Sequence, residues 1–231
     1  MIRNAVALLL LFGLGSVFAS LLFGYSPDAE LNLTARYYAD HTAQDVGAAN
    51  IVTAIIVTYR GLDTLGEVTV LFLASAIVAL VLRQDQNKEP RSNRYPTGEL
   101  LHTGSRLLVP LMLLFGAYVF MNGHLTPGGG FQGGAIVASA FLLLLLTDPM
   151  RRFSHRMIAR IESIAGMSYV LLGLLGLALA GGFLDNRILP LGTFGALFSA
   201  GIIPVIYSLI GLKVGAEFSA MLVSLSETEK S

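Results

Sequence analysis

Long runs of apolar residues without a formal charge dominate this sequence. The stretches from Asn4 to Pro27 and from Leu107 to Thr147 contain no Asp, Glu, Lys or Arg. A bilayer core of roughly 30 Å is crossed by about 20 mostly apolar residues in a helix. Because soluble cores do not need such runs, the pattern predicts a polytopic membrane protein. Five segments meet the length requirement: Ala5–Gly24, Leu107–Met121, Gly133–Leu146 with its flanks, Ile164–Leu184 and Leu191–Leu222.

A sixth crossing needs polar residues to reach the required length. Val68–Leu82 spans the bilayer only if Thr64–Glu67 joins it, which draws Glu67 and Asp63 into or beside the apolar zone. The preceding Ile51–Tyr59 is apolar but reaches only about 14 Å as a helix. We expect it to be a re-entrant or half-spanning helix that breaks at Arg60-Gly61, as is tolerated where the freed backbone is buried in protein or lines a wet cavity.

The predicted fold class is therefore all-α: a polytopic membrane protein with about six transmembrane helices plus a short re-entrant or half-spanning helix. In the last crossing, which we extend to Leu225, Pro204 predicts a kink. Val17-Phe18-Ala19 before Ser20 resembles a signal-peptide cleavage site, but the apolar run continues through Phe23. An uncleaved membrane anchor is the favoured interpretation.

Basic residues predict the orientation of the chain. With a cytoplasmic N-terminus the outer loops hold only Arg36 and Arg187, and Arg60 and Lys213 lie in the membrane zone. The positive-inside rule therefore predicts that both termini are cytoplasmic in the cell (inner) membrane. The inner segments hold all the other basic residues: Arg3, Arg83, Lys88, Arg91, Arg94, Arg106, Arg151, Arg152, Arg156, Arg160 and Lys230.

One polar stretch divides the chain. Arg83–Gly98 is rich in charged residues and proline and stands between apolar regions. Such a shift in composition is typical of a domain boundary. We predict a two-crossing membrane module at residues 1–83, a cytoplasmic linker at 84–99 and a four-crossing module at 100–231.

Composition narrows the function further. The chain is 54% hydrophobic and only 13% charged, its net charge is zero and it has no cysteine. The balance of acidic and basic residues leaves no basic face for binding nucleic acid. The absence of cysteine excludes disulfides, thiolate zinc sites and Cys-ligated iron–sulfur clusters. We expect no cofactor, no metal and no enzymatic activity.

Arg60, Asp63 and Glu67 stand at i, i+3 and i+7 and so share one face of a helix. They are either a solvated cluster at the outer membrane surface or part of an ion or proton route. Charged groups within a bilayer are costly and are normally paired and functional, which favours the route. On that interpretation Arg60 keeps Asp63 ionised, and Glu67, one turn deeper, is desolvated enough to exchange a proton near neutral pH.

Lys213 and Glu217 form a second charged set, at i and i+4 in the last helix. Lys213 could extend its ammonium to the cytoplasmic surface, but Glu217 is too short to do so and apolar residues still follow it. The pair is therefore either a charge relay or a structural ion pair, and the sequence leaves both open.

The most distinctive string is Asn122 to Gly134, NGHLTPGGGFQGG. It contains G-x-G-x-x-G, but without a preceding strand a dinucleotide site is excluded. Small residues spaced four apart allow membrane helices to pack closely, so we assign a packing role to Gly128, Gly129, Gly130, Gly133 and Gly134. His124 at the turn titrates near neutrality and is either structural or part of the ion path.

This string closely resembles the signature of the B subunit of Mrp-type multisubunit Na⁺/H⁺ antiporters and its equivalents in membrane-bound energy-converting hydrogenases, over roughly residues 100–225. The segment from Asn50 to Glu67 resembles the C-terminal element of the antiporter A subunit, which is a separate small subunit in the hydrogenases. The resemblance implies that Asp63 and Glu67 correspond to carboxylates that contribute to ion or proton transfer. Thr53 and Thr58 depart from the family pattern, which places any cation ligand there in doubt.

The leading hypothesis is a membrane subunit of a multisubunit monovalent cation/proton antiporter module. It would contribute intramembrane charges to transfer and helix packing to assembly. The resemblance implies obligate partners, including large antiporter-like subunits. The alternative is a purely structural spacer in the membrane arm of an energy-converting hydrogenase-type or related redox complex. A self-sufficient transporter is disfavoured because no internal inverted repeat is visible.

Overall fold

The structure is a computed structural model that describes residues 2–25, 30–84, 98–148 and 153–228. Every regular element in this part of the chain is helical. Six of the helices are long and apolar enough to cross a membrane, which confirms the predicted fold class. The predicted linker lies outside the described residues except at its two ends, as do the following basic residues used for the orientation: Lys88, Arg91, Arg94, Arg151, Arg152 and Lys230.

The chain forms two compact units, residues 1–37 and 38–231. The first contains α1 (Ile2–Gly24), in which Asn4–Gly24 is long and apolar enough to cross a membrane. It also contains the start of α2 (Leu33–Asp45), whose first turn is capped where the Ala35 amide donates to Asn32 Oδ1 at 2.8 Å. We did not predict α2, because its polar sequence resembles a loop.

The second unit begins its membrane part with a broken helix. Asn50 caps α3 (Ile51–Thr53), which continues directly into the π-helical segment η1 (Ala54–Tyr59). The helix ends at Arg60, and α4 (Gly61–Gln84) starts at the next residue. The break therefore falls at the predicted Arg60-Gly61 step, and the candidate span Gly61–Leu82 includes Asp63 and Glu67.

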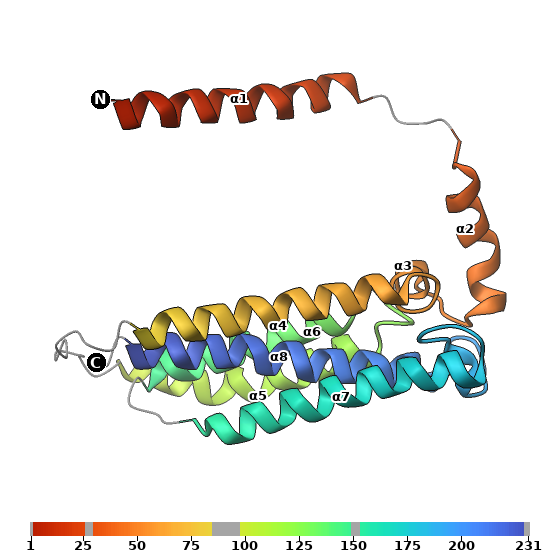
Figure 1. The fold of residues 1–231 in the computed structure, drawn as a ribbon. Helices are drawn as coiled ribbons and strands as arrows, with labels where there is room; N and C mark the ends of the chain where they lie inside the picture. Colours follow the sequence, from red (N-terminus) through yellow and green to blue (C-terminus); the bar gives the residue numbers. More distant parts are fainter. Residues whose placement is uncertain (1, 26–29, 85–97, 149–152, 229–231) are drawn as a thin grey trace. The chain divides into compact units, whose positions relative to one another are not determined.

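The long helices of the second unit pack around a central one, α8 (Ile203–Thr228), and run along the bundle beside it (Figure 1). The central α8 contacts α4, α5 (Glu99–Met121), α6 (Gly130–Thr147) and α7 (His155–Leu179). It is the most deeply buried of the spanning helices, with 56% of its span inside the chain. Its buried side chains form the main core with residues of η1 and α7: Ile203, Ile206, Tyr207, Ile210 and Val214 together with Ala54, Val57 and Tyr169.

The expected start of the last crossing is wrong. Residues 191–202 form a loop rather than a helix, with left-handed φ values at Gly192, Gly195 and Gly201. Pro204 does not kink a helix but stands in the first turn of α8, where the missing proline N–H is not needed. The left-handed backbone at these glycines prevents a regular helix before residue 203, so α8 is shorter than predicted.

Two other boundaries also differ from the expected ones. α5 begins at Glu99 and α7 at His155, both well before the apolar runs that predicted them. Ser154 caps α7 by accepting a hydrogen bond from the Met157 amide at 3.4 Å. The first turns of α5 and α7 are polar, so hydropathy alone does not predict them as helix.

Candidate functional site: buried charges and a glycine loop

The glycine-rich loop between α5 and α6 is bonded to the broken helix α3–η1. The Asn50 side-chain amide donates to the carbonyls of Gly123 at 2.9 Å and Thr126 at 3.0 Å. The Asn50 backbone amide donates to the His124 carbonyl at 3.0 Å. Because Asn50 Oδ1 also caps α3, this one residue fixes the start of the short helix and the path of the loop.

A second set of bonds connects the same loop to the central helix. The Thr53 hydroxyl donates to the Gly123 carbonyl at 2.6 Å, and the buried Tyr207 hydroxyl donates to Thr53 Oγ1 at 3.0 Å. A Cβ at residue 123 would lie 2.6 Å from the Tyr207 ring, so only glycine fits there. Thr53 is thus used in structural bonds, whereas Thr58 Oγ1 is buried without a hydrogen bond.

Replacing Asn50 with Asp tests the bonds to the loop. Asp keeps one oxygen that can cap α3. Its other carboxylate oxygen replaces the NH₂ group that donates to two carbonyl oxygens in the wild type, so oxygen would face oxygen. We expect Asn50→Asp to lower the free energy of unfolding by about 1–3 kcal/mol. The measurement is the apparent melting temperature of the purified protein. Asn32→Asp is the matched control because Asn32 is an exposed cap of α2, and a similar drop in both variants would contradict the assignment.

His124 is fully buried beneath the loop at residues 191–202. Its Nε2 lies 3.4 Å from the Ala196 carbonyl, and Nδ1 makes no hydrogen bond. Loss of hydration on burial lowers the pKa of His124 below its ordinary value, and this outweighs the nearby carbonyls of Ala196, Met121 and Leu197. Burial therefore favours the neutral imidazole over the charged form.

The glycines of α6 lie against two neighbouring helices. A Cβ at Gly134 would lie 2.8 Å from the Gly211 carbonyl, and one at Gly130 would meet the Ile210 side chain of α8. On the other face, a Cβ at Gly133 would lie 2.7 Å from the Gly116 carbonyl of α5. At the preceding turn, a Cβ at Gly128 would contact the Val119 carbonyl at 2.8 Å, and Gly129 has a φ of 153°.

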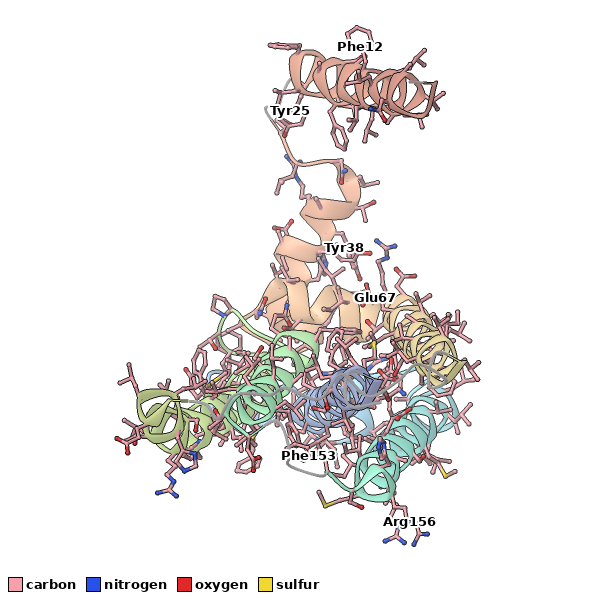
Figure 2. All side chains as sticks on the ribbon, turned by 90° about the vertical axis from the view of Figure 1, so that its left-hand side faces the viewer. Phe12, Tyr25, Tyr38, Glu67, Phe153 and Arg156 are labelled. Carbon is pink, nitrogen blue, oxygen red and sulfur yellow. The ribbon has the colours of Figure 1, made fainter. Side chains whose placement is uncertain are left out.

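The structure brings Arg60 and Asp63 together but leaves Glu67 apart from them. Arg60 Nη2 lies 2.5 Å from Asp63 Oδ2, with 62% and 52% of the two side chains exposed. Glu67 is also exposed, near the edge of the bundle (Figure 2), and no ion pair in the described part of the chain includes it. These charges therefore lie on the surface that this chain presents to its surroundings.

Lys213 and Glu217 form a buried ion pair. Lys213 Nζ lies 2.6 Å from Glu217 Oε1, and the two residues are 8% and 0% exposed. Phe72 of α4 covers the ammonium, with its ring centre 5.2 Å from Nζ. Lys213 thus does not extend to the membrane surface, and Glu217 Oε2 is left without a hydrogen bond.

Sequence reasoning missed two polar residues before the loop at residues 191–202. The buried Asn186 side chain donates to the carbonyls of Val46 at 2.7 Å and Ala200 at 3.1 Å. Hydrogen bonds from Arg187 hold the pKa of Asp185 below its ordinary value despite burial. The available signal is the Asp-Asn-Arg string at residues 185–187, which interrupts the apolar residues on either side of it.

The two halves of the chain match two different protein families. A family described as the E subunit of MBH matches residues 2–93. A family described as "Domain related to MnhB subunit of Na+/H+ antiporter" matches residues 100–220, more than half of the chain. The chain belongs to this MnhB-related family. The bonds from Asn50 and Thr53 to the glycine loop therefore connect the two matched regions.

Relatives of this MnhB-related chain occur in two kinds of complex. The B subunit of a Na⁺/H⁺ antiporter of Bacillus subtilis is 35% identical over 104 residues, which is 45% of this chain and 71% of that protein. A chain in the structure of a membrane-bound sulfane sulfur reductase, an archaeal respiratory membrane complex, is 44% identical with a TM-score of 0.81, covering 97% of this chain and 98% of that one. A chain of the Mrp complex from Dietzia sp. DQ12-45-1b is 26% identical with a TM-score of 0.81, and this chain covers only 26% of it.

Proposed function

We propose that this MnhB-related chain is a non-catalytic membrane subunit of a multisubunit monovalent cation/proton antiporter module. The observation that carries the proposal is the pairing of two family matches in one chain with an ion pair buried inside a membrane-spanning helix. A buried charged pair in a bilayer is expensive and is typically kept for ion or proton transfer. Large antiporter-like subunits are the expected partners, and the relatives with solved structures are themselves chains of membrane complexes.

Within this function the charged residues take different roles. The exposed Arg60, Asp63 and Glu67 face whatever adjoins α4, so they would hand protons or cations across a subunit contact. The Lys213–Glu217 pair would act inside the chain. Residues 1–83 and 100–231 would be the two modules, joined by the linker at 84–99, and the glycines of α6 would hold the second module together.

The orientation with both termini cytoplasmic agrees with the positions of the basic residues in the second unit. α5 and α7 begin, and α4 and α8 end, at one end of the helix bundle (Figure 1). Arg156 points away from the bundle at the start of α7 (Figure 2), whereas Arg60 and Arg187 are at the other end. Because basic residues favour the cytoplasmic side, this end would face the cytoplasm of a cell with the chain in its inner membrane.

A respiratory complex is the second candidate for the parent assembly. The match to a chain of the sulfane sulfur reductase complex extends over almost the whole of both chains. The same module would then be driven by electron transfer in other subunits. Purifying the complex through a tag on this chain tests the point, because iron–sulfur subunits among the co-purified proteins would favour the respiratory assembly.

Glu67→Gln tests the proposed role in transfer. We expect cation/proton exchange in membrane vesicles to fall by roughly 10–100-fold, because the amide cannot accept and release a proton. Assembly should be unchanged, since a substitution at an exposed position usually shifts the free energy of unfolding by no more than about 0.5 kcal/mol. Glu30→Gln is the control, because Glu30 is exposed outside the spanning segments. Normal exchange by Glu67→Gln would favour the structural spacer.

A further inference from the structure

A groove on the outside of the bundle runs between α4, α7 and α8. Its wider part is a cavity of about 290 Å³ lined by Glu162, Gly166 and Tyr169 of α7, by α4, and by Lys213 of α8. Glu162, Gly166 and Tyr169 stand at i, i+4 and i+7 and share one helix face. An adjoining cavity of about 250 Å³ is lined by His155, Glu162 and Ser224. Glu162 borders both cavities and so lies at their junction.

Lys213 reaches into the wider cavity across Gly166. A Cβ at Gly166 would lie 3.4 Å from Lys213 Cδ and 3.6 Å from Nζ, so the end of the lysine side chain lies beside α7 at this residue. The ammonium bonds Glu217 Oε1 on one side and shares the cavity with Glu162 on the other. The carboxylates of Glu162 and Glu217 also interact with each other electrostatically. One ammonium is thus placed among two carboxylates.

One buried polar group that lines the groove, the Tyr169 hydroxyl, points to water as its ligand. Tyr169 lines the wider cavity, is 1% exposed, and its hydroxyl makes no hydrogen bond within the chain. Glu217 Oε2 is likewise buried and unbonded. A polar group without a partner in an apolar environment is costly, and the wider cavity is large enough for several water molecules. Water held there would contact the lining residues Tyr169, Lys213 and Glu162.

The geometry points to Glu162 as a second proton-exchanging carboxylate, which shares the Lys213 ammonium with Glu217 through water in this groove. In one state of this exchange Lys213 pairs with Glu217, as observed, while Glu162 holds the proton. When Lys213 turns to Glu162, the proton leaves that carboxyl through water and binds Glu217. One proton and one ammonium exchange places, so the net charge does not change. This inference rests on the proposed function and extends its path by one residue.

The narrower cavity gives this site a route to one membrane face. It ends at His155 and Ser224, near the start of α7 and the end of α8, which is the end proposed to be cytoplasmic. Toward the other end, Leu65, Val68 and Thr69 of α4 line the wider cavity, and Glu67 acts electrostatically on Tyr169. The titratable groups that line the two cavities with Glu162 are His155, Tyr169 and Lys213, and Glu217 interacts with it electrostatically. The groove therefore leads from the end proposed to be cytoplasmic to Lys213 of the buried pair.

The test uses the complete complex with Glu162→Gln, Glu162→Asp and the matched control Glu99→Gln, which removes an exposed carboxylate at the start of α5. Exchange in proteoliposomes should fall roughly 10–100-fold in Glu162→Gln, recover in large part in Glu162→Asp and stay normal in Glu99→Gln. Infrared difference spectra of the purified complex give a second readout that does not need transport. A protonated-carboxyl band that shifts in heavy water should be lost in Glu162→Gln alone.

The two readouts separate this inference from the proposed function. If the wild-type complex exchanges no cations for protons, the proposed function fails, and the infrared band still decides whether Glu162 holds a proton. Wild-type exchange by Glu162→Gln overturns the inference. A carboxyl band that persists unchanged in Glu162→Gln overturns it as well, because Glu162 then holds no exchangeable proton.

Discussion

Lys213→Met is expected to abolish exchange and to reduce the yield of assembled complex more than any other single charge substitution in the chain. Glu217 is 0% exposed and accepts its hydrogen bond from Lys213 at 2.6 Å, so the variant leaves a buried carboxylate without a cation. An uncompensated buried charge costs about 3–5 kcal/mol unless the group takes up a proton. Either outcome removes the ionised pair.

A double variant separates the structural role of this pair from its role in transfer. Replacing both partners with apolar residues of similar volume is often neutral or stabilising, so Lys213→Met with Glu217→Met should restore assembly. Exchange should remain absent if the pair carries protons. Assembly is measured by size-exclusion chromatography of the purified complex, and exchange in membrane vesicles. A double variant that exchanges at the wild-type rate would assign the pair a purely structural role.

Arg60→Met is the matched control, because it breaks a pair of the same charges at a different depth. The Arg60 and Asp63 side chains are more than half exposed within this chain. Exposed ion pairs contribute about 0–1 kcal/mol, so the assembled yield of Arg60→Met should stay near that of the wild type. The difference in assembled yield between Lys213→Met and Arg60→Met then shows how strongly the effect of losing one cation depends on burial.

The sequence was sufficient to predict the membrane helices and the local charge pairs. A hydrophobic run long enough to span a bilayer has few alternatives to a helix, since every backbone group needs a partner in lipid. Pairing of Lys213 with Glu217 follows from the i, i+4 spacing on one helix face. Both are local properties of the chain. The break after Tyr59 could be predicted for the same reason, since the apolar run is too short to span.

What could not be predicted depends on residues far apart in the sequence. Asn50 bonds carbonyls 73 and 76 residues away, and Asn186 bonds one 140 residues away. An asparagine in a polar stretch normally indicates a turn or a cap, so its sequence gives no sign of a buried long-range role. Glu162 was overlooked for a similar reason. It follows a basic stretch at the start of α7, and only the packing of three helices shows that it borders the same groove as Lys213.

The proline and the glycines near the last crossing indicate different structures, and the glycines decide the outcome. Pro204 inside a long apolar run predicts a kink, but proline is also favoured in the first turn of a helix. Gly192, Gly195 and Gly201 decide between the two, because their left-handed backbone ends any regular helix before residue 203. The resulting loop covers His124, so this boundary determines whether that histidine is buried or exposed.

Gly134→Leu is expected to prevent assembly of the four-helix region around α8. A Cβ at residue 134 would lie 2.8 Å from both the Gly211 carbonyl and Val214 Cβ, and 2.9 Å from the Gly215 amide nitrogen. Two of these three atoms belong to the backbone of the central helix, which cannot move aside as the end of a side chain can. Overpacking of a tight core commonly costs about 1–3 kcal/mol for added methylene groups, and a whole leucine side chain here should cost more.

Gly104→Leu is the matched control, because a Cβ there has no atom within 4 Å and the substitution is identical. Gly134→Ala adds only the Cβ and should lie between the control and Gly134→Leu. The measurement is the yield of intact complex after size-exclusion chromatography, relative to the amount of this chain in the membrane. Since each 1.4 kcal/mol corresponds to about a tenfold change in an equilibrium constant, Gly134→Leu should reduce the yield at least tenfold. A yield equal to that of Gly104→Leu would mean that α6 and α8 separate in the assembled complex, and that the close approach at Gly134 does not hold the subunit together.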